Sequence, residues 1–396
     1  MYYLMNKNIK LASFDLVNTF GVEEPVLIEE LTGLPVWIPN IKEWIETRSA
    51  VKHRKHIENL FKEYGISDIR GFIDITRCLS LTDTLWVKSD FDYVDWEDVS
   101  LYTHEFNEVL SKSLFEGIIL EDLDLSLTSP DVTTDGQFDK CWIREDNTIK
   151  LIKCGTGENS VYAWNNNHGR EPYSEVLASP IFEILCGGVH YDLDKYSGRT
   201  VSKCMLFTDE KYGYISYARY YRRRDGILEL FPEYEKLGSL NEFIGMIIAD
   251  CVTINSDRHY GNFGFKIDND TLLPVGINKC FDYNLALFPR ANWNFGFEDM
   301  FHFQMHNIHR FGYPYDSLAK PFINDRYRAE LINLKDLILH IECDEVFDRK
   351  RLDFVNWFKN KQIDMLLGNR VNFNLYSKEN KATSISKLLA EAGGNK

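Results

Sequence analysis

The sequence predicts an α+β protein with two lobes, a β-rich lobe followed by a mostly helical lobe, and an extra N-terminal region. Strand-like segments bounded by Gly, Asp and Asn gather between residues 121 and 225. Apolar residues at helical spacing dominate residues 226–396. A chain of 396 residues is also too long for one ordinary core. We therefore expect three regions, 1–120, 121–225 and 226–396.

The composition narrows the classes of function. The formal net charge of −15 argues against a broad surface that follows nucleic acid or anionic lipid. The N-terminal residues lack the pattern of a signal peptide, and no apolar run approaches the ~18 residues of a spanning helix. We expect a cytoplasmic protein with no direct contact to nucleic acid or membrane. The eight cysteines are widely spaced without a C-x-x-C pair, which indicates buried reduced thiols rather than disulfides or a zinc site.

The N-terminal region contains two helical patterns and no catalytic set. The first covers residues 41–65 and stops at Gly65, and the second covers residues 102–117 and stops at Gly117. We interpret residues 1–120 as a scaffold or a partner-binding surface.

The central region consists of strand-like segments interrupted by one helix. The strand-like segments are 133–143, 148–155, 201–208 and 212–221. The helical segment "GREPYSEVLASPIFEILCGG" has Pro172 in its first turn, and Gly187-Gly188 ends it.

In the C-terminal region, Ser239 and Glu242 have the spacing of a capping box. This pattern predicts the start of an apolar, buried helix "LNEFIGMIIADCVTI". Further helices are expected in 325–341 and 351–368, followed by a polar tail.

A β-rich lobe joined to a helical lobe can clamp a nucleotide, and phosphoryl transfer from ATP needs a cation on the phosphates. Alternation in "TIKLIKCG" places Lys153 on a strand face shared with an apolar residue. Glu171 and Glu175 follow near the start of the inserted helix, four residues apart and therefore on one face. Either could pair with Lys153, and the deeper apolar context narrowly favours Glu175.

A flexible turn should cover the phosphates, and the Asp-Gly dipeptide in "TTDGQFDK" is a strong hairpin signal. We assign nucleotide contacts to this turn and to the strand face around it. The residues assigned to cofactor binding are Gly136, Gln137, Lys140, Lys153, Met205 and Phe207.

The segment "INSDRHYGNFGF" contains the candidates for the catalytic base and for one metal ligand. Asp257 and Asn262 have the D-x-x-x-x-N spacing of a loop whose Asp orients and deprotonates the acceptor hydroxyl and whose Asn binds Mg²⁺. Twenty residues after Asn262, Asp282 follows a strand-like segment and supplies a second oxygen ligand for Mg²⁺. We include His259 in the catalytic set, with bracing of this loop as its expected role.

The same segments carry a family resemblance. "SDRHYGNFGF", "FDYN", "TTDGQFDKCW", "LIKCG" and "EPYSEVLAS" resemble the corresponding motifs of HipA-like serine/threonine kinases of the Firmicutes type. The resemblance covers roughly residues 120–300 and implies a bilobal kinase fold, ATP and Mg²⁺, and a protein Ser/Thr substrate. It also implies a toxin acting beside a helix-turn-helix antitoxin-like partner. The family often autophosphorylates a Ser-rich loop, whereas this chain has Thr133 and Thr134 there, which puts autophosphorylation in doubt.

Three alternatives stay open at this stage. The D-R-H-x-x-N string also occurs in phosphatidylinositol kinases, although the net charge disfavours an anionic membrane. A small-molecule phosphotransferase would use the same arrangement of an Asp and an Asn in this loop. A non-catalytic nucleotide-binding protein would have no chemical need for Lys153, Asp257, Asn262 and Asp282 together.

Overall fold

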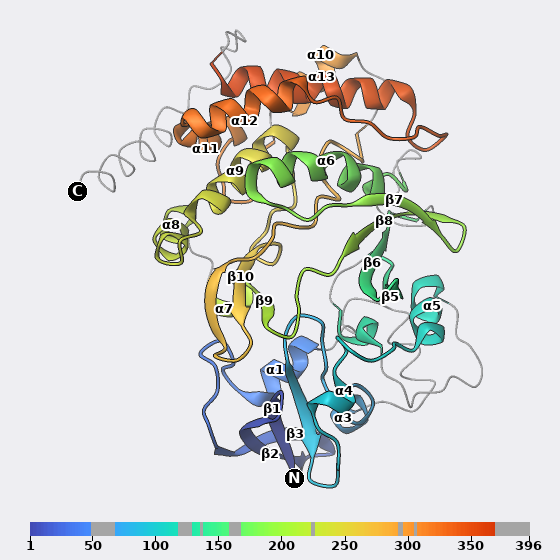
Figure 1. Ribbon diagram of the computed structural model, residues 1–396, viewed down its shortest axis with the longest axis vertical. Helices are drawn as coiled ribbons and strands as arrows, with labels where there is room; N and C mark the ends of the chain where they lie inside the picture. The colour runs from blue at the N-terminus through green and yellow to red at the C-terminus, as the bar shows by residue number, and fades with distance from the viewer. Residues whose placement is uncertain are drawn as a thin grey trace.

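The computed structural model describes most of the chain. The described residues are 1–48, 68–117, 129–134, 138–157, 168–222, 226–291, 296–304 and 307–368. The N-terminal sheet lies at the opposite end of the molecule from the last long helices (Figure 1).

The N-terminal region is built on a four-stranded antiparallel sheet of order β3-β2-β1-β4. Its strands are β1 (Tyr2–Asn6), β2 (Ile9–Thr19), β3 (Val22–Glu30) and β4 (Leu85–Ser89). Because successive side chains alternate between sheet faces, Leu4 joins the large core with Trp44, while Met5 joins a second core with Trp86. The helices of this region are α1 (Ile41–Arg48), α3 (Ile69–Thr76), α4 (Trp96–Val99) and α5 (Glu108–Glu116).

The predicted helix ends of this region can be tested in part. The helix expected over 41–65 begins at Ile41, and its described part ends at Arg48, so its predicted stop at Gly65 lies outside the described residues. The second helix is shorter than expected but ends as predicted, because Gly117 takes the left-handed conformation at φ +68°.

The central sheet is antiparallel with order β5-β6-β8-β7. Its strands are β5 (Lys140–Glu145), β6 (Thr148–Cys154), β7 (Asp192–Tyr196) and β8 (Arg199–Met205), and the short helix η2 (Pro130–Thr133) precedes them. Lys153 on β6 pairs with Lys140 on β5 and with Ser202 on β8, so these three side chains share one face. The predicted inserted helix is α6 (Glu171–Cys186), with Pro172 in its first turn and Gly187 as its left-handed cap.

A third sheet of order β11-β10-β9 joins the central region to the C-terminal region. Its strands are β9 (Tyr212–Ser216), β10 (Gly264–Asp268) and β11 (Leu273–Ile277), and α7 (Tyr217–Tyr221) follows β9 directly. Because β9 pairs with β10, sheet membership changes between β8 and β9, earlier in the chain than the expected boundary after residue 225.

The C-terminal region is helical and centred on α9. The elements are α8 (Ile227–Lys236), α9 (Leu240–Thr253), α10 (Phe297–Gln304), α11 (Tyr315–Ala319), η4 (Lys320–Phe322), α12 (Asp325–Asp336) and α13 (Arg349–Leu366). Helix α9 contacts α6, α8, α11 and α13 (Figure 1). At Gly245 a Cβ would lie 1.9 Å from the Leu185 carbonyl oxygen, so only glycine allows α6 and α9 to approach this closely. The chain thus has a bilobal α+β architecture, as predicted.

The capping box predicted at Ser239 and Glu242 is wrong, although α9 does begin after Ser239. The Ser239 side chain makes no capping bond, and its hydroxyl instead accepts a hydrogen bond from the Ile277 amide at 3.0 Å. A tertiary contact with β11 has therefore replaced the local one.

The cysteine prediction agrees with the structure. All eight thiols are free and only Cys343 is exposed. Among the described residues, no group of three or more His, Cys, Asp or Glu side chains could hold a metal ion on its own. Within the same part of the chain, no helix has the length and apolar character needed to span a bilayer.

Candidate active site

A buried lysine joins three separate elements at the centre of the molecule. Lys153 on β6 contacts the Glu175 carboxylate from α6, and its Nζ lies 2.8 Å from Oδ1 of Asp282 in the loop after β11. Its side chain is 7% exposed, that of Glu175 1% and that of Asp282 23%. Glu175 also accepts a hydrogen bond of 2.6 Å from the Ser202 hydroxyl on β8. The lysine is therefore held between a buried anchor and a carboxylate that water reaches.

The two carboxylates differ electrostatically. Burial by itself lowers the pKa of Lys153, but attraction to Asp282 and Glu175 outweighs it and the net pKa is raised. Burial raises the pKa of Glu175, and the nearby Lys153 offsets this only in part. For Asp282, burial is outweighed by Lys153, with help from Lys140 and Arg258, and the pKa is lowered. Asp282 is thus kept ionised, as a metal ligand requires.

Lys153→Met is expected to lower the free energy of unfolding at pH 7 by about 2–3 kcal/mol, because the charged groups lose their partner. Without the lysine, the folded-state pKa values of Glu175 and Asp282 both rise, because attraction to Lys153 lowers them in the wild-type protein. The penalty is then present at pH 7 and shrinks as pH falls and the two carboxyls protonate. Urea unfolding at pH 7 and pH 4.5 measures this difference.

The exposed Lys236→Met on α8 is the control, and its effect should be small and independent of pH. A Lys153→Met penalty that stayed equal at the two pH values would contradict the coupling of the three groups.

Glu171, the alternative partner of Lys153, has other contacts. Its carboxylate accepts hydrogen bonds from the amide and hydroxyl of Thr156, the former at 3.0 Å, and Arg290 Nε lies 3.3 Å away. Four residues further into the helix, Glu175 reaches the strand lysine. Glu171 instead braces the chain that leaves β6.

The polar segment after α9 forms a tight loop. Helix α9 ends at Thr253, the following Ile254 takes φ +47°, and the chain then turns through Asp257. Asn262 Nδ2 donates to the Asp257 carbonyl oxygen at 2.9 Å, and its Oδ1 accepts no hydrogen bond from the described residues. The Asp257 side chain is 25% exposed, with Oδ1 3.3 Å from Nη2 of the exposed Arg310. The loop thus offers an amide oxygen and an accessible carboxylate.

A buried ion pair beneath this loop was missed in the sequence analysis. Arg258 is fully buried, its Nε lies 3.1 Å from Oδ2 of Asp250 on α9, and His309 contacts the same oxygen at 3.1 Å. Arg258 Nη1 donates to the carbonyl oxygens of Asn262 and Phe281, each at 2.8 Å. Arg258 therefore ties the Asn262 loop to the residue before Asp282. The only sequence signal was a charge, Asp250, within the otherwise apolar run of residues 243–252.

His259 lies on the exposed side of the loop, where its Nδ1 accepts a hydrogen bond of 3.0 Å from the Gly261 amide. This contact fits a brace for the loop.

The residues assigned to nucleotide contact have different surroundings. Gly136 and Gln137 lie outside the described residues. Lys140 neighbours Lys153 across the β5–β6 pair, and Met205 is exposed at the end of β8. Phe207 packs instead on Phe281, with ring centroids 5.3 Å apart, so it supports the loop that carries Asp282.

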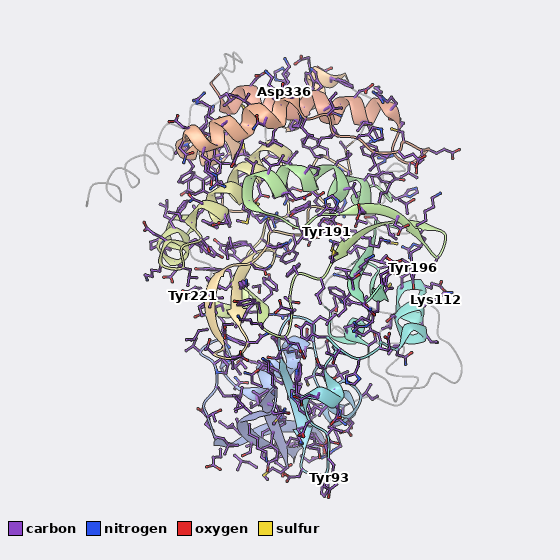
Figure 2. All side chains as sticks on the ribbon, viewed as in Figure 1. Tyr93, Lys112, Tyr191, Tyr196, Tyr221 and Asp336 are labelled. Carbon is purple, nitrogen blue, oxygen red and sulfur yellow. The ribbon has the colours of Figure 1, made fainter. Side chains whose placement is uncertain are left out.

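Tyr191 is a further supporting residue that the sequence did not reveal. Its hydroxyl accepts a hydrogen bond of 3.3 Å from the Asp282 amide, and Lys153 Nζ lies 5.7 Å from its ring centroid. In Figure 2 it lies beneath α6 at the junction of the two lobes.

The donor set fits Mg²⁺ bound together with a nucleotide. Mg²⁺ prefers oxygen ligands, keeps several waters and needs only one or two protein groups beside substrate phosphates. Asn262 Oδ1 and the ionised Asp282 carboxylate are oxygen donors that would hold the metal, and Lys153 would supply a cation for the phosphates. Bound Mg²⁺ would neutralise phosphate charge.

The two threonines considered for autophosphorylation have engaged hydroxyls. Thr133 is buried and donates to the Leu79 carbonyl oxygen at 2.7 Å. Thr134 donates to the Pro130 carbonyl oxygen at 2.7 Å and accepts from Trp142 Nε1 at 2.8 Å. In this conformation neither threonine hydroxyl is free to receive a phosphoryl group, because each is engaged in hydrogen bonds within the fold.

Comparison with known proteins gives similarity of fold only. No protein-family model and no curated protein matches the chain. A crystal structure of the Helicobacter pylori proinflammatory kinase CtkA is 17% identical, with a TM-score of 0.47, covering 61% of this chain and 95% of that one. A chain of the Shewanella oneidensis MR-1 complex of HipA, HipB and operator DNA is 12% identical, with a TM-score of 0.49, covering 92% of this chain and 96% of that one.

Proposed function

We propose that this chain is an ATP- and Mg²⁺-dependent kinase that transfers the γ-phosphoryl group to a Ser or Thr hydroxyl of a protein. The observation that carries the proposal is the contact of one buried lysine with both Glu175 and Asp282. A strand lysine paired with a helix glutamate, beside a metal-binding aspartate, is the arrangement that positions ATP in protein kinases. The neighbouring loop supplies the Asp and Asn that the same chemistry needs.

Each residue has one role in this proposal. Lys153, held by Glu175, positions the phosphates, and Asn262 and Asp282 hold the metal. Asp257 orients the acceptor hydroxyl and takes its proton as the bond from the acceptor oxygen to the γ-phosphorus forms and the bond to the β,γ-bridging oxygen breaks. Arg258 is a positioning residue that keeps the Asn262 and Asp282 segments together.

Labelled ATP tests the proposal. Purified protein is incubated with γ-labelled ATP, Mg²⁺ and a cell lysate, and labelled species are identified by mass spectrometry. We expect label on protein Ser or Thr that is lost with a chelator and in Asp282→Asn, because an amide is a weaker Mg²⁺ ligand than a carboxylate. Asp353→Asn, in an exposed pair with Arg349 on α13, should transfer label normally.

The other outcomes would select the alternatives. Label only on lipid or on a small molecule would overturn protein phosphorylation and support a lipid or small-molecule phosphotransferase. Mg²⁺-dependent nucleotide binding without transfer to any acceptor would support a non-catalytic nucleotide-binding protein. The helix-turn-helix antitoxin-like partner and the toxin role stay predictions from the sequence resemblance.

A further inference from the structure

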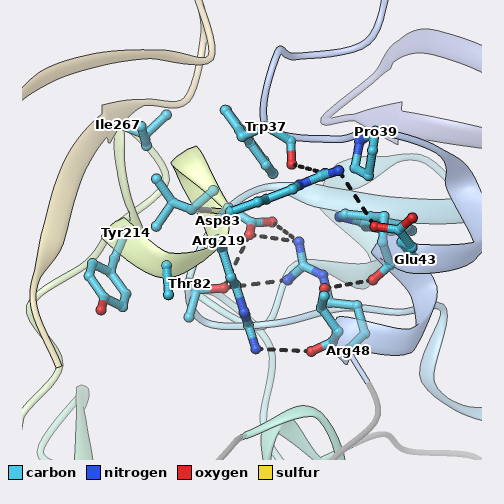
Figure 3. A pocket seen from close by; sticks show the side chains of 14 residues that line it. Trp37, Pro39, Glu43, Arg48, Thr82, Asp83, Tyr214, Arg219 and Ile267 are labelled. Atoms are coloured by element: carbon cyan, nitrogen blue, oxygen red, sulfur yellow. Dashed lines mark hydrogen bonds and ion pairs between the residues drawn. The ribbon is translucent and has the colours of Figure 1, made fainter. Parts of the chain in front are cut away.

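A cavity lies away from the Lys153 site, between the N-terminal region and the third sheet. It has a volume of about 220 Å³ and is lined by 14 residues, including Trp37, Trp44 and Arg48 on one side and Tyr214, Arg219 and Arg222 on the other. Figure 3 shows side chains from β9, β10 and α7 facing α1 and the loop before it. Nothing in the proposed kinase chemistry uses this cavity.

Hydrogen bonds hold the two sides of the cavity in place. Arg219 donates to the Thr47 carbonyl oxygen at 3.2 Å, and Arg222 donates to the Trp37 carbonyl oxygen at 3.0 Å. Arg48 forms a buried ion pair with Asp83, with the closest N–O distance at 2.6 Å (Figure 3). The cavity walls are therefore fixed by the fold rather than by loosely packed surface side chains.

The lining favours a planar anion. Three aromatic side chains, Trp37, Trp44 and Tyr214, contribute apolar surface, and the Arg48 guanidinium lies 4.9 Å from the Trp44 ring centroid. The charged lining residues are three arginines and two carboxylates, and Arg48 pairs with Asp83 while Arg222 pairs with Glu43 at 3.5 Å. The lining therefore carries one positive charge in excess, contributed by Arg219, in a chain whose net charge is −15. Arginine also recognises carboxylate and phosphate groups with its planar fork of N–H donors.

One lining group has an unmet hydrogen-bonding need. Trp44 is 3% exposed, and its indole Nε1 has no hydrogen-bond partner among the described residues. A buried donor without a partner costs about 1–3 kcal/mol, and an acceptor on a bound molecule would remove that cost. An acceptor on a bound molecule that reaches Nε1 would satisfy this donor, which is a requirement separate from the charge of the lining.

The cavity also touches the proposed catalytic loop through Tyr214. The Tyr214 hydroxyl donates to the Gly261 carbonyl oxygen at 2.9 Å, in the turn before Asn262. Its ring packs on Phe281, next to Asp282, with centroids 5.3 Å apart. One side chain thus contacts the cavity and both metal-binding segments.

We propose that this cavity is a regulatory site for a small planar ring bearing one carboxylate or phosphate group, linked by Tyr214 to the catalytic loop. The aromatic walls hold the ring, the excess positive charge of the lining attracts the anionic group, and Trp44 donates to an acceptor on the ligand. The link to catalysis rests on the proposed function, whereas binding of the anion does not.

Calorimetry and ligand-detected NMR with the full chain test binding. The probes are benzoate and phenyl phosphate, with the neutral isostere benzamide for comparison. We expect saturable binding of at least one anion, at least about tenfold tighter than that of benzamide, and about tenfold weaker in Trp44→Phe, which keeps the ring but loses the N–H. Trp357→Phe on α13 is the matched control.

If Trp44→Phe does not fold, as judged by circular dichroism, Arg222→Gln is measured instead. It removes one positive charge from the partly exposed side of the cavity and should also weaken anion binding. The site would be ruled out by an absence of saturable anion binding, by benzamide binding equally well, or by unchanged affinity in these variants.

The link to catalysis has a separate readout. Filling the cavity with the tighter anion should change the affinity for MgADP at least about threefold, MgADP should change the anion affinity by the same factor, and Tyr214→Phe should abolish both changes. Unchanged MgADP affinity would overturn the regulatory role. If MgADP does not bind while the anion does, the proposed kinase function fails and the cavity remains a ligand site.

Discussion

Asp257→Asn is expected to slow phosphoryl transfer about 10²–10⁴-fold, the range that a positioned general base contributes. The substitution keeps the shape of the side chain and removes its capacity to take the acceptor proton. Nucleotide affinity should change little, because Asp257 does not contact Lys153 and Asn262 binds its backbone carbonyl oxygen rather than its carboxylate.

Single-turnover transfer from labelled ATP, with nucleotide affinity measured separately by calorimetry, distinguishes the two effects. Asp353→Asn on α13 controls for loss of an exposed carboxylate that also pairs with an arginine. Transfer at the wild-type rate in Asp257→Asn would show that another group accepts the proton. A parallel loss of nucleotide affinity would assign Asp257 to binding instead.

Arg258→Met is expected to lower the free energy of unfolding by about 3–5 kcal/mol, because Asp250 is left charged and buried without its main partner. The carbonyl oxygens of Asn262 and Phe281 lose their donor at the same time. Arg349→Met, at an exposed position on α13, should change stability by less than about 1 kcal/mol.

Urea unfolding at pH 7 measures both variants, and Asp250→Asn/Arg258→Met separates charge from packing. If the uncompensated carboxylate dominates the loss, the double variant should recover part of the stability of the single variant. A loss below about 1 kcal/mol in Arg258→Met would refute the view that this pair holds the two segments together. Any folded Arg258→Met should also transfer phosphate more slowly, since Asn262 and Asp282 lose their common tether.

Local patterns in the sequence predicted many elements correctly. Pro172 and Gly187 mark the first turn and the end of α6, and Gly117 ends α5, because the backbone preferences of Pro and Gly act within a few residues. The same local logic failed at Ser239, whose hydroxyl binds β11 instead of capping α9. When a side chain has two possible hydrogen-bond partners, the tertiary structure decides which one it contacts. A local sequence pattern carries no information about that structure.

In the candidate site, too, some features follow from the local sequence and others from the tertiary structure. The spacing of Asp257 and Asn262 is a property of one short loop, and the sequence alone determined which residues that loop presents. Only the tertiary structure decided that Lys153 pairs with Glu175 rather than Glu171, and that Arg258 joins the Asn262 loop to the Asp282 segment. These contacts span 22 or more residues and depend on how distant elements pack against one another. Periodicity and spacing report which face of an element a residue occupies, whereas the partner across that face is set by packing between distant elements.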